Sequence, residues 1–172
     1  DFDDYTSSVK IKLRSETKRL PAIGLKMGFQ MPNTDQAKGI GTNQINIFTK
    51  LILQKKFGSV LNRTAKFNLF GNIGLGVFTA PIDRFTQNDM LLYGLAGIYR
   101  VNGRINVLAE VNGRANTRRT NAPIGTESQS ELRVGAQIKA SNVRFDAAAT
   151  FGLTKHTHRT GLIFGVTYLS PS

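Results

Sequence analysis

The chain has 172 residues and a formal net charge of +12, from 23 lysines and arginines against 11 acids, and it contains neither cysteine nor tryptophan. The lack of cysteine excludes a disulfide framework and a thiolate metal site, and no apolar run approaches the roughly 18 residues of a membrane-spanning helix. The charge is compatible with nucleic acid, lipid head groups or an anionic solute as a partner, and the placement of the charges must decide among them.

Apolar and polar residues alternate along nearly the whole chain, a period of two that predicts strands, and no segment has convincing helical periodicity. In chain order the pattern predicts nine strands, at about 5–15, 22–31, 44–56, 65–79, 89–101, 104–117, 130–140, 143–154 and 160–169. The alternation over 44–56 and 65–79 is less regular, because Phe48, Ile52 and Phe70 fall on the polar side. In 89–101 both sides are mostly apolar.

The predicted connections alternate in length. Short turns are expected around 18–21, around 58–63, at 102-NG-103, which is a strong hairpin signal, and at 141-SN-142. Longer polar connections are expected at 32–42, 81–88 and 118–129, with a shorter one at 155–159. Tight turns would therefore lie at one end of the sheet and mostly longer loops at the other.

Two kinds of barrel fit this alternation. A soluble lipocalin-like barrel has its apolar face inside, whereas a transmembrane barrel has it outside. Strands of about 10 to 15 residues exceed the roughly 5–6 of typical soluble strands, and short turns alternating with longer loops are typical of outer-membrane barrels. Aromatic residues near the predicted strand ends would suit interfacial girdles, although plain packing also explains them: Tyr5, Phe29, Tyr93, Tyr99, Phe145 and Tyr168. The sequence therefore predicts an all-β fold, a single antiparallel transmembrane β-barrel domain over 1–172.

On this prediction the two sides of each strand meet different surroundings. The residues expected to face lipid are Ile105, Val107, Leu132, Val134, Ile138, Phe145, Phe151 and Phe164. The residues expected to line the lumen are Lys10, Lys12, Arg14, Lys26, Lys50, Lys66, Arg100, Arg104, Glu110, Arg114, Glu131, Arg133, Lys139, Arg144 and Asp146, with Glu16 as a further acid.

A family resemblance supports the same prediction. The stretch 20-LPAIGLKMGFQMPNTDQAKGIGTNQINI-47 has a strand with Pro and alternating Gly, the turn MPNTD and the strand entry GIGTNQINI, and 89-DMLLYGLAGIYRVNGRINVLAEVNG-113 has a strand, a tight turn and a Glu-bearing strand. In these features the chain resembles the MetA-like outer-membrane proteins named for the meta pathway of phenol degradation. The resemblance covers about 20–169. It implies an outer-membrane barrel that passes small, often hydrophobic or aromatic molecules, with no catalytic residues. Phe164, Val166 and Tyr168 are then a candidate signal for the barrel-assembly machinery.

The strand count has a consequence for closure. If the longer loops are extracellular, the last strand ends in the periplasm, and bacterial barrels of this kind have even strand numbers. We therefore expect at least one strand before Asp1, so that the chain is the C-terminal part of a larger, even-stranded barrel, for example of 12 strands. The competing explanation is that one strand in 44–56 or 65–79 is divided wrongly.

The predicted function is passive passage of small molecules, anionic or hydrophobic, through a basic lumen. The basic excess favours anions, but Arg–Glu pairs between neighbouring strands could equally be a structural network. The apolar inner group could guide hydrophobic solutes or pack against a plug or partner: Phe48, Ile52, Phe70, Met90, Leu92 and Ile98.

Other functions receive less support. His156 and His158 could hold a metal ion, but two loop histidines without nearby acids fit a loop tip better. No spacing signature links a His to a Ser or Asp, so no enzyme and no cofactor is predicted. Nucleic-acid binding is not expected, because the charges alternate along strands instead of clustering. The expected location is the bacterial outer membrane, with lipid, lipopolysaccharide and possible envelope proteins as partners. The alternatives are a non-conducting barrel that anchors an envelope assembly and a soluble lipocalin-like binder.

Overall fold

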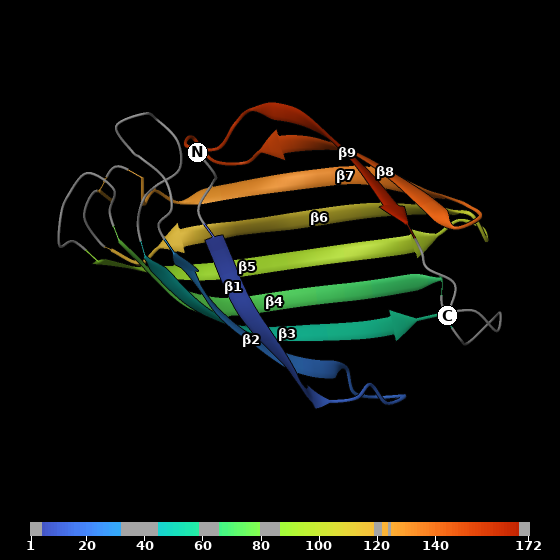
Figure 1. Ribbon diagram of the computed structural model, residues 1–172, viewed down its shortest axis with the longest axis horizontal. Helices are drawn as coiled ribbons and strands as arrows, with labels where there is room; N and C mark the ends of the chain where they lie inside the picture. The colour runs from blue at the N-terminus through green and yellow to red at the C-terminus, as the bar shows by residue number, and fades with distance from the viewer. Residues whose placement is uncertain are drawn as a thin grey trace.

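A computed structural model describes residues 5–31, 45–58, 66–79, 87–118, 122–123 and 125–168. These residues form one nine-stranded sheet in which every strand pairs antiparallel with its neighbours in sequence (Figure 1). The strands are β1 (Tyr5–Arg14), β2 (Ala22–Met31), β3 (Asn46–Phe57), β4 (Phe67–Thr79), β5 (Gln87–Arg100), β6 (Ile105–Asn116), β7 (Gln129–Ala140), β8 (Val143–Gly152) and β9 (Thr160–Tyr168).

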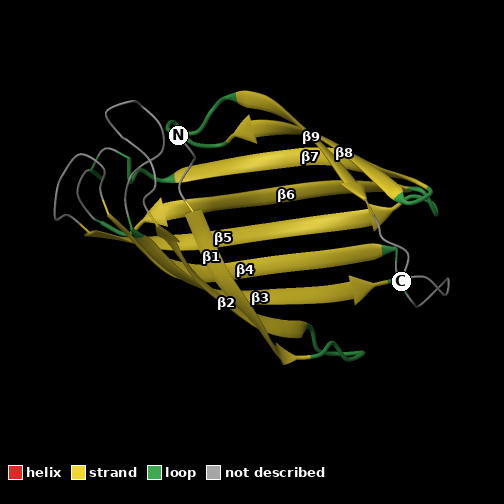
Figure 2. Cartoon of the chain, in the orientation of Figure 1, coloured by secondary structure: helices red, strands yellow, loops and turns green. Residues whose placement is uncertain are grey.

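The predicted all-β class and the nine strands are confirmed. Each observed boundary lies within two residues of the predicted one. Residues 46–57 and 67–79 are separate strands that pair over twelve positions, from Asn46 with Phe78 to Phe57 with Phe67. The irregular alternation in this region therefore does not reflect a strand divided wrongly. Within the described residues no helix occurs, so none has the length and apolar character to cross a membrane (Figure 2).

The connections at one end of the sheet are mostly shorter than those at the other end, as predicted, but the nine-residue connection of β3 to β4 is longer than the seven-residue connection of β4 to β5. Ala140 and Val143 pair directly around Ser141 and Asn142, and Ser141 has a φ of 53°, in the left-handed region. The β5–β6 hairpin differs from the prediction, because four residues, 101–104, connect the strands and not Asn102 and Gly103 alone. The side chain of Asn102 organises this turn, since its Oδ1 accepts hydrogen bonds of 2.8 Å from the backbone N–H groups of Arg104 and Ile105.

The sheet curls, so that β1 lies across the front of the central strands and β9 lies near the opposite margin in Figure 1. β1 and β9 are the two edge strands, and no pairing joins them in the described part of the chain. Both strands run from the end with the longer connections to the end with the short turns, so they point in the same direction along the sheet.

A hydrogen bond and an ion pair connect the β1–β2 turn to β3. The carboxylate of Glu16 accepts a hydrogen bond of 2.8 Å from the backbone N–H of Lys56 and lies 3.4 Å from Lys55 Nζ. This hydrogen bond from Lys56, together with the charge and hydrogen bond of Lys55, holds the pKa of Glu16 below its ordinary value.

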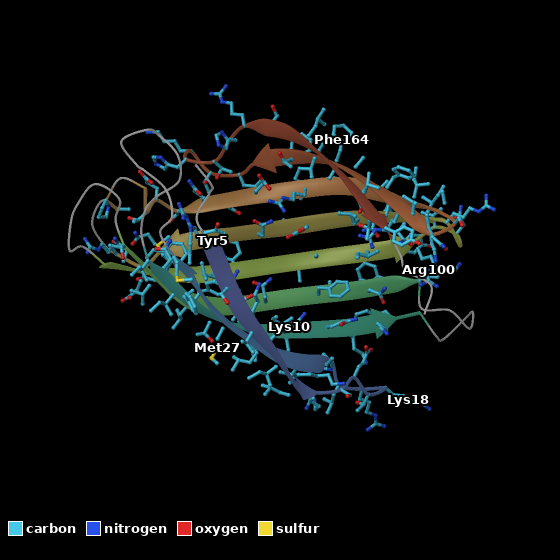
Figure 3. All side chains as sticks on the ribbon, viewed as in Figure 1. Tyr5, Lys10, Lys18, Met27, Arg100 and Phe164 are labelled. Carbon is cyan, nitrogen blue, oxygen red and sulfur yellow. The ribbon has the colours of Figure 1, made fainter. Side chains whose placement is uncertain are left out.

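The two faces of the sheet differ sharply in composition. Cross-strand partners share a face, and one such row joins Ile105, Ile138, Phe145 and Val166 across four strands. These residues belong to an outer face of apolar side chains that is largely exposed, with Val134 at 47% and Phe164 at 76% of full exposure. Figure 3 shows Met27 and Phe164 pointing away from the interior of the curled sheet.

The inner face carries the polar and charged side chains. In the described residues the buried large apolar side chains are only Met90 and Leu92, and both lie on this inner face. The described residues therefore form no apolar interior of the lipocalin kind, because their large apolar side chains are mostly on the outer face.

Candidate functional site

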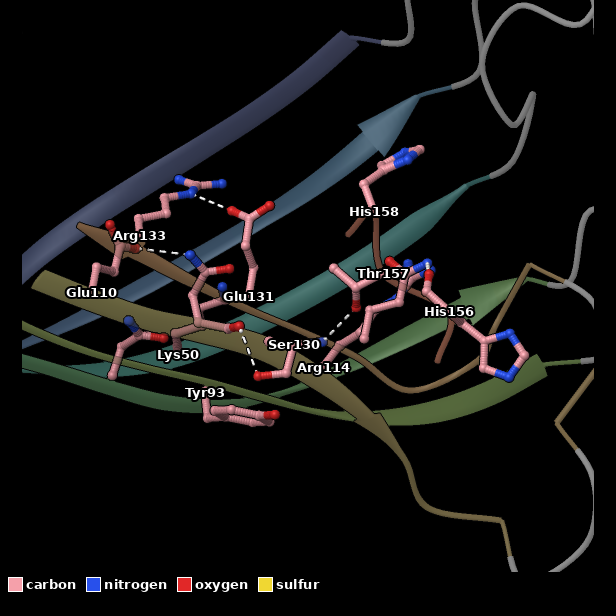
Figure 4. A pocket seen from close by; sticks show the side chains of 14 residues that line it. Lys50, Tyr93, Glu110, Arg114, Ser130, Glu131, Arg133, His156, Thr157 and His158 are labelled. Carbon is pink, nitrogen blue, oxygen red and sulfur yellow. Dashed lines mark hydrogen bonds and ion pairs between the residues drawn. The ribbon is translucent and has the colours of Figure 1, made fainter. Parts of the chain in front are cut away.

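A polar hollow of about 570 Å³ lies on the inner face, toward the end with the longer connections. The registers place five charged residues around it from three strands: Lys50 on β3, Glu110 and Arg114 on β6, and Glu131 and Arg133 on β7. Figure 4 shows these side chains on one side of the strands, with Tyr93 on the other side. The sequence-predicted lumen residues Lys50, Glu110, Arg114, Glu131 and Arg133 are thus brought together.

Two ion pairs stabilise the inner face on β7 and β8. Arg133 Nε donates to the carboxylate of Glu131, two residues along the same strand. Arg144 Nε lies 3.0 Å from Asp146 Oδ1 in the corresponding arrangement on β8. In each pair both side chains are partly exposed. Such pairs contribute about 0–1 kcal/mol each, so they order the side chains more than they stabilise the fold.

Gly125 and Thr126, in the connection between β6 and β7, bind side chains of the inner face. Arg114 Nη2 donates to the carbonyl oxygen of Gly125 at 3.2 Å, and its guanidinium lies 5.6 Å from the ring centre of Phe78. The side-chain amide of Asn116 donates to the carbonyl oxygen of Thr126 at 2.8 Å, and Thr126 is almost completely buried. Because Arg114 and Asn116 lie on the inner face, the two residues of the connection that they bind narrow the interior at the end of the sheet with the longer connections. Sequence reasoning missed this feature, since no local pattern shows that a loop turns inward.

The connection between β8 and β9 also reaches the hollow. Gln129 Nε2 donates to the carbonyl oxygen of His156 at 3.0 Å, and the backbone N–H of Ser130 donates to Thr157 Oγ1 at 3.1 Å. His156 and His158 are exposed at the rim. No cluster of three His, Cys, Asp or Glu suited to a metal ion occurs among the described residues.

Several predicted basic residues lie away from the hollow. A β-bulge between Lys12 and Arg14 places Arg14 opposite Ile23, out of line with Lys10 and Lys12, and its Nη2 donates to the carbonyl oxygen of Pro21. Alternation alone could not predict this, because a bulge shifts the register by one residue. A second group of predicted lumen residues is exposed at the end with the short turns: Lys66, Arg100, Arg104 and Lys139.

The inner apolar group divides into two parts. Met90 and Leu92 are buried, at 0% and 6% exposure, beside Phe48 and Gly76. The remaining members are half-buried and lie toward the short turns: Ile52, Phe70 and Ile98. Near them Asn68 Oδ1 and Asn72 Oδ1 are buried without a hydrogen-bond partner in the described part of the protein. Buried amide oxygens need a partner, so a hydrated interior suits this face.

The outer face has its own hollow, of about 740 Å³ and mostly apolar. Its outward-facing walls include Val9, Met27, Phe29, Ile47, Leu75 and Val77.

The aromatic residues only partly follow the predicted girdles. Phe57, Phe67 and Tyr99 are cross-strand neighbours at the end with the short turns, and the rings of Phe57 and Phe67 lie 6.1 Å apart. Tyr93 does not lie at a strand end as predicted, because it is in the middle of β5, where its ring covers Gly113. Packing of the ring against Gly113 therefore explains the position of Tyr93 better than a place at a membrane–water interface does.

No protein-family model matches the chain, and no curated protein matches it either. The resemblance to the MetA-like outer-membrane proteins therefore stays a prediction. Placement of the chain in a functional class rests on the geometry of its two faces.

Proposed function

We propose that the chain forms the wall of a bacterial outer-membrane β-barrel that passes small solutes passively through a polar, mainly basic interior. The outer face would contact lipid and lipopolysaccharide, and β9 would engage the barrel-assembly machinery during insertion. This role needs no cofactor and no catalytic group.

The observation that carries the proposal is the inverted arrangement of the two faces. Large apolar side chains on β2–β9 are exposed, whereas charged side chains of β3, β6 and β7 surround an internal hollow. Exposed apolar area of this extent is unfavourable in water, at about 25 cal/mol per Å², and favourable against hydrocarbon. A soluble lipocalin-like binder would have the opposite arrangement.

Planar-bilayer recording of the purified protein tests the proposal. We expect a steady conductance with a reversal potential that indicates anion preference, because basic rings favour anions. Arg133→Glu should reduce that preference, whereas the same charge change at Arg19, exposed in the β1–β2 turn, should leave it nearly unchanged. A protein that inserts fully but carries no current would contradict passage.

The second candidate is a non-conducting barrel that anchors an envelope assembly. The ion pairs of Arg133 with Glu131 and of Arg144 with Asp146, together with the inward β6–β7 connection, favour it. A barrel that is silent in bilayers and co-purifies with envelope proteins would support this candidate.

Closure of the barrel is part of the proposal. Because β1 and β9 run in the same direction, pairing them with each other would give a parallel ladder, whereas an odd number of additional strands would give an antiparallel one. We therefore propose that strands preceding Asp1 complete an even-stranded barrel. The mass of the native protein tests this, and a mass close to 18.9 kDa would contradict it.

A further inference from the structure

Three lysines lie side by side across β1, β2 and β3. Lys10 is the direct cross-strand partner of Lys26, and Lys26 is the direct partner of Lys50. Directly opposed residues share one face, with Cβ atoms about 4.5–5.5 Å apart. Lys50 lines the polar hollow, so this lysine ladder of Lys10, Lys26 and Lys50 lies on the inner face.

No acid interrupts the row to which the ladder belongs. The register continues it through Gly74, Leu92, Arg114 and Gln129. Like charges directly opposite one another destabilise a sheet, and no carboxylate in the described residues forms an ion pair with the ladder. Elsewhere on the wall Glu131 and Asp146 are each bound by an arginine.

Two of the lysine ammonium groups lie near the same aromatic ring. Lys26 Nζ and Lys50 Nζ lie 5.7 and 5.9 Å from the ring centre of Phe48, within the range of a cation–π contact. The direct cross-strand partners of Phe48 are Gly28 on β2 and Gly76 on β4, so neither partner has a side chain beside the ring. Beyond Gly76 the row reaches the buried Met90.

The site thus combines a cationic ladder, with which no carboxylate of the described residues forms an ion pair, and an apolar floor, which is the partly exposed ring of Phe48 with Met90 and Leu92 buried beside it. A small inorganic anion would use only the ladder, whereas an organic oxyanion would use both parts. Lysine ammonium groups bind carboxylate and phosphate as point charges without a demand for bidentate geometry.

We propose that the lysine ladder and the floor beside it bind organic oxyanions, that is, carboxylates or phosphates attached to a short apolar body. This inference deepens the proposed passage function and rests on it for its biological use. The ladder would concentrate such solutes inside the barrel, and the floor would select those with an alkyl part.

Binding can be measured separately from conduction. The full chain is reconstituted in nanodiscs, its lysines are reductively methylated with ¹³C, and the Lys10, Lys26 and Lys50 methyl signals are followed during titration with acetate, hexanoate, hexyl phosphate, inorganic phosphate and hexanol. We expect ladder signals to shift with hexanoate and hexyl phosphate, with affinity rising about fourfold over acetate or inorganic phosphate for each methylene buried. Hexanol should leave the ladder signals unchanged.

Matched variants locate the site. Lys26→Gln combined with Lys50→Gln should weaken hexanoate binding at least tenfold. Lys139→Gln removes one lysine charge from the same face, ten residues along β7 from the row of the ladder, which is roughly 33 Å and beyond a Debye length of about 10 Å. It should leave binding within twofold of the unsubstituted protein.

The outcomes distinguish this inference from the proposed function. Ladder signals that respond in a barrel without conductance would support the site and contradict passage. Ladder signals that stay unchanged in a conducting barrel, or equal affinities for acetate and hexanoate, would overturn the site. The unsubstituted protein alone gives both results, so the inference does not depend on the variants folding.

Discussion

Replacing Val134 by arginine tests which face of the sheet meets hydrocarbon, through the change in the free energy of unfolding. Val134 is the sixth of the twelve residues of β7, on the outer face, and is 47% exposed. If this face meets hydrocarbon, an arginine near the bilayer midplane should cost about 2–4 kcal/mol, which is roughly a 30-fold to 700-fold change in the unfolding equilibrium at about 1.4 kcal/mol per factor of ten.

The magnitude should depend on depth. Ile138 is on the same face four residues further along β7, which is about 10 Å nearer the interface for a rise of about 3.3 Å per residue and a tilt of about 40°. Ile138→Arg should therefore cost only about 0–1 kcal/mol. Gln137→Arg, on the inner face beside Asn106 and Asp146, should be close to neutral.

The assay is reversible guanidinium unfolding of the protein in phosphatidylcholine vesicles. Unfolding is followed by far-ultraviolet circular dichroism, since the chain has no tryptophan whose fluorescence could report it. A Val134→Arg effect within about 0.5 kcal/mol, as for an ordinary exposed surface position, would refute the reasoning. Equal costs at Val134 and Gln137 would refute it as well.

Three further predictions concern the fold. Ser141→Gly should raise the free energy of unfolding by up to about 1 kcal/mol, because Ser141 has a φ of 53° and left-handed backbone is costly for any residue with a Cβ; Asn142→Gly, measured by the same unfolding assay, should bring no gain. Gly74→Ala should prevent or strongly weaken folding, since its Cβ would fall against the backbone oxygen of Thr49 and 2.7 Å from Lys50 Cα, whereas Gly103 has nothing within 4 Å and Gly103→Ala should fold normally in a heat-modifiability gel. Glu16→Gln should lower the free energy of unfolding at pH 7, and this difference should shrink as the pH falls below the ordinary glutamate pKa, because a lowered pKa contributes stability that is present above that value and is lost as the pH falls through the folded value; an unfolding difference that is as large in strong acid as at pH 7 would contradict this.

Much of the fold follows from alternation alone. Side chains that alternate with a period of two predict nine strands, each with an apolar and a polar side. The residues from Ile105 to Asn116 show this pattern with the one exception of Leu108, which lies on the polar side. The polar hollow follows in part, because antiparallel neighbours bring Glu110 opposite Arg133 once the register is known.

The remaining features depend on contacts that a linear pattern does not contain. The bulge that displaces Arg14 depends on the pairing of β1 with β2. The position of Tyr93 over Gly113 depends on the register of β5 and β6, which also explains an aromatic residue in mid-strand. The inward β6–β7 connection is held by Arg114 and Asn116 through backbone carbonyl groups, and backbone acceptors are present at every residue. The lysine ladder likewise becomes visible only when three strands are aligned.

The orientation of the two faces can be measured most directly by spin labels placed one at a time from 131 to 138 in β7, which is practical because the chain has no native cysteine. In bilayers, labels at 132, 134, 136 and 138 should collide with dissolved oxygen, and labels at 131, 133 and 137 should collide with a water-soluble nickel chelate. Gly135 is left unlabelled, because a side chain there would fall against the backbone oxygen of Ala147. The opposite alternation, or access of the nickel chelate to both sets, would contradict a wall with hydrocarbon outside and water inside.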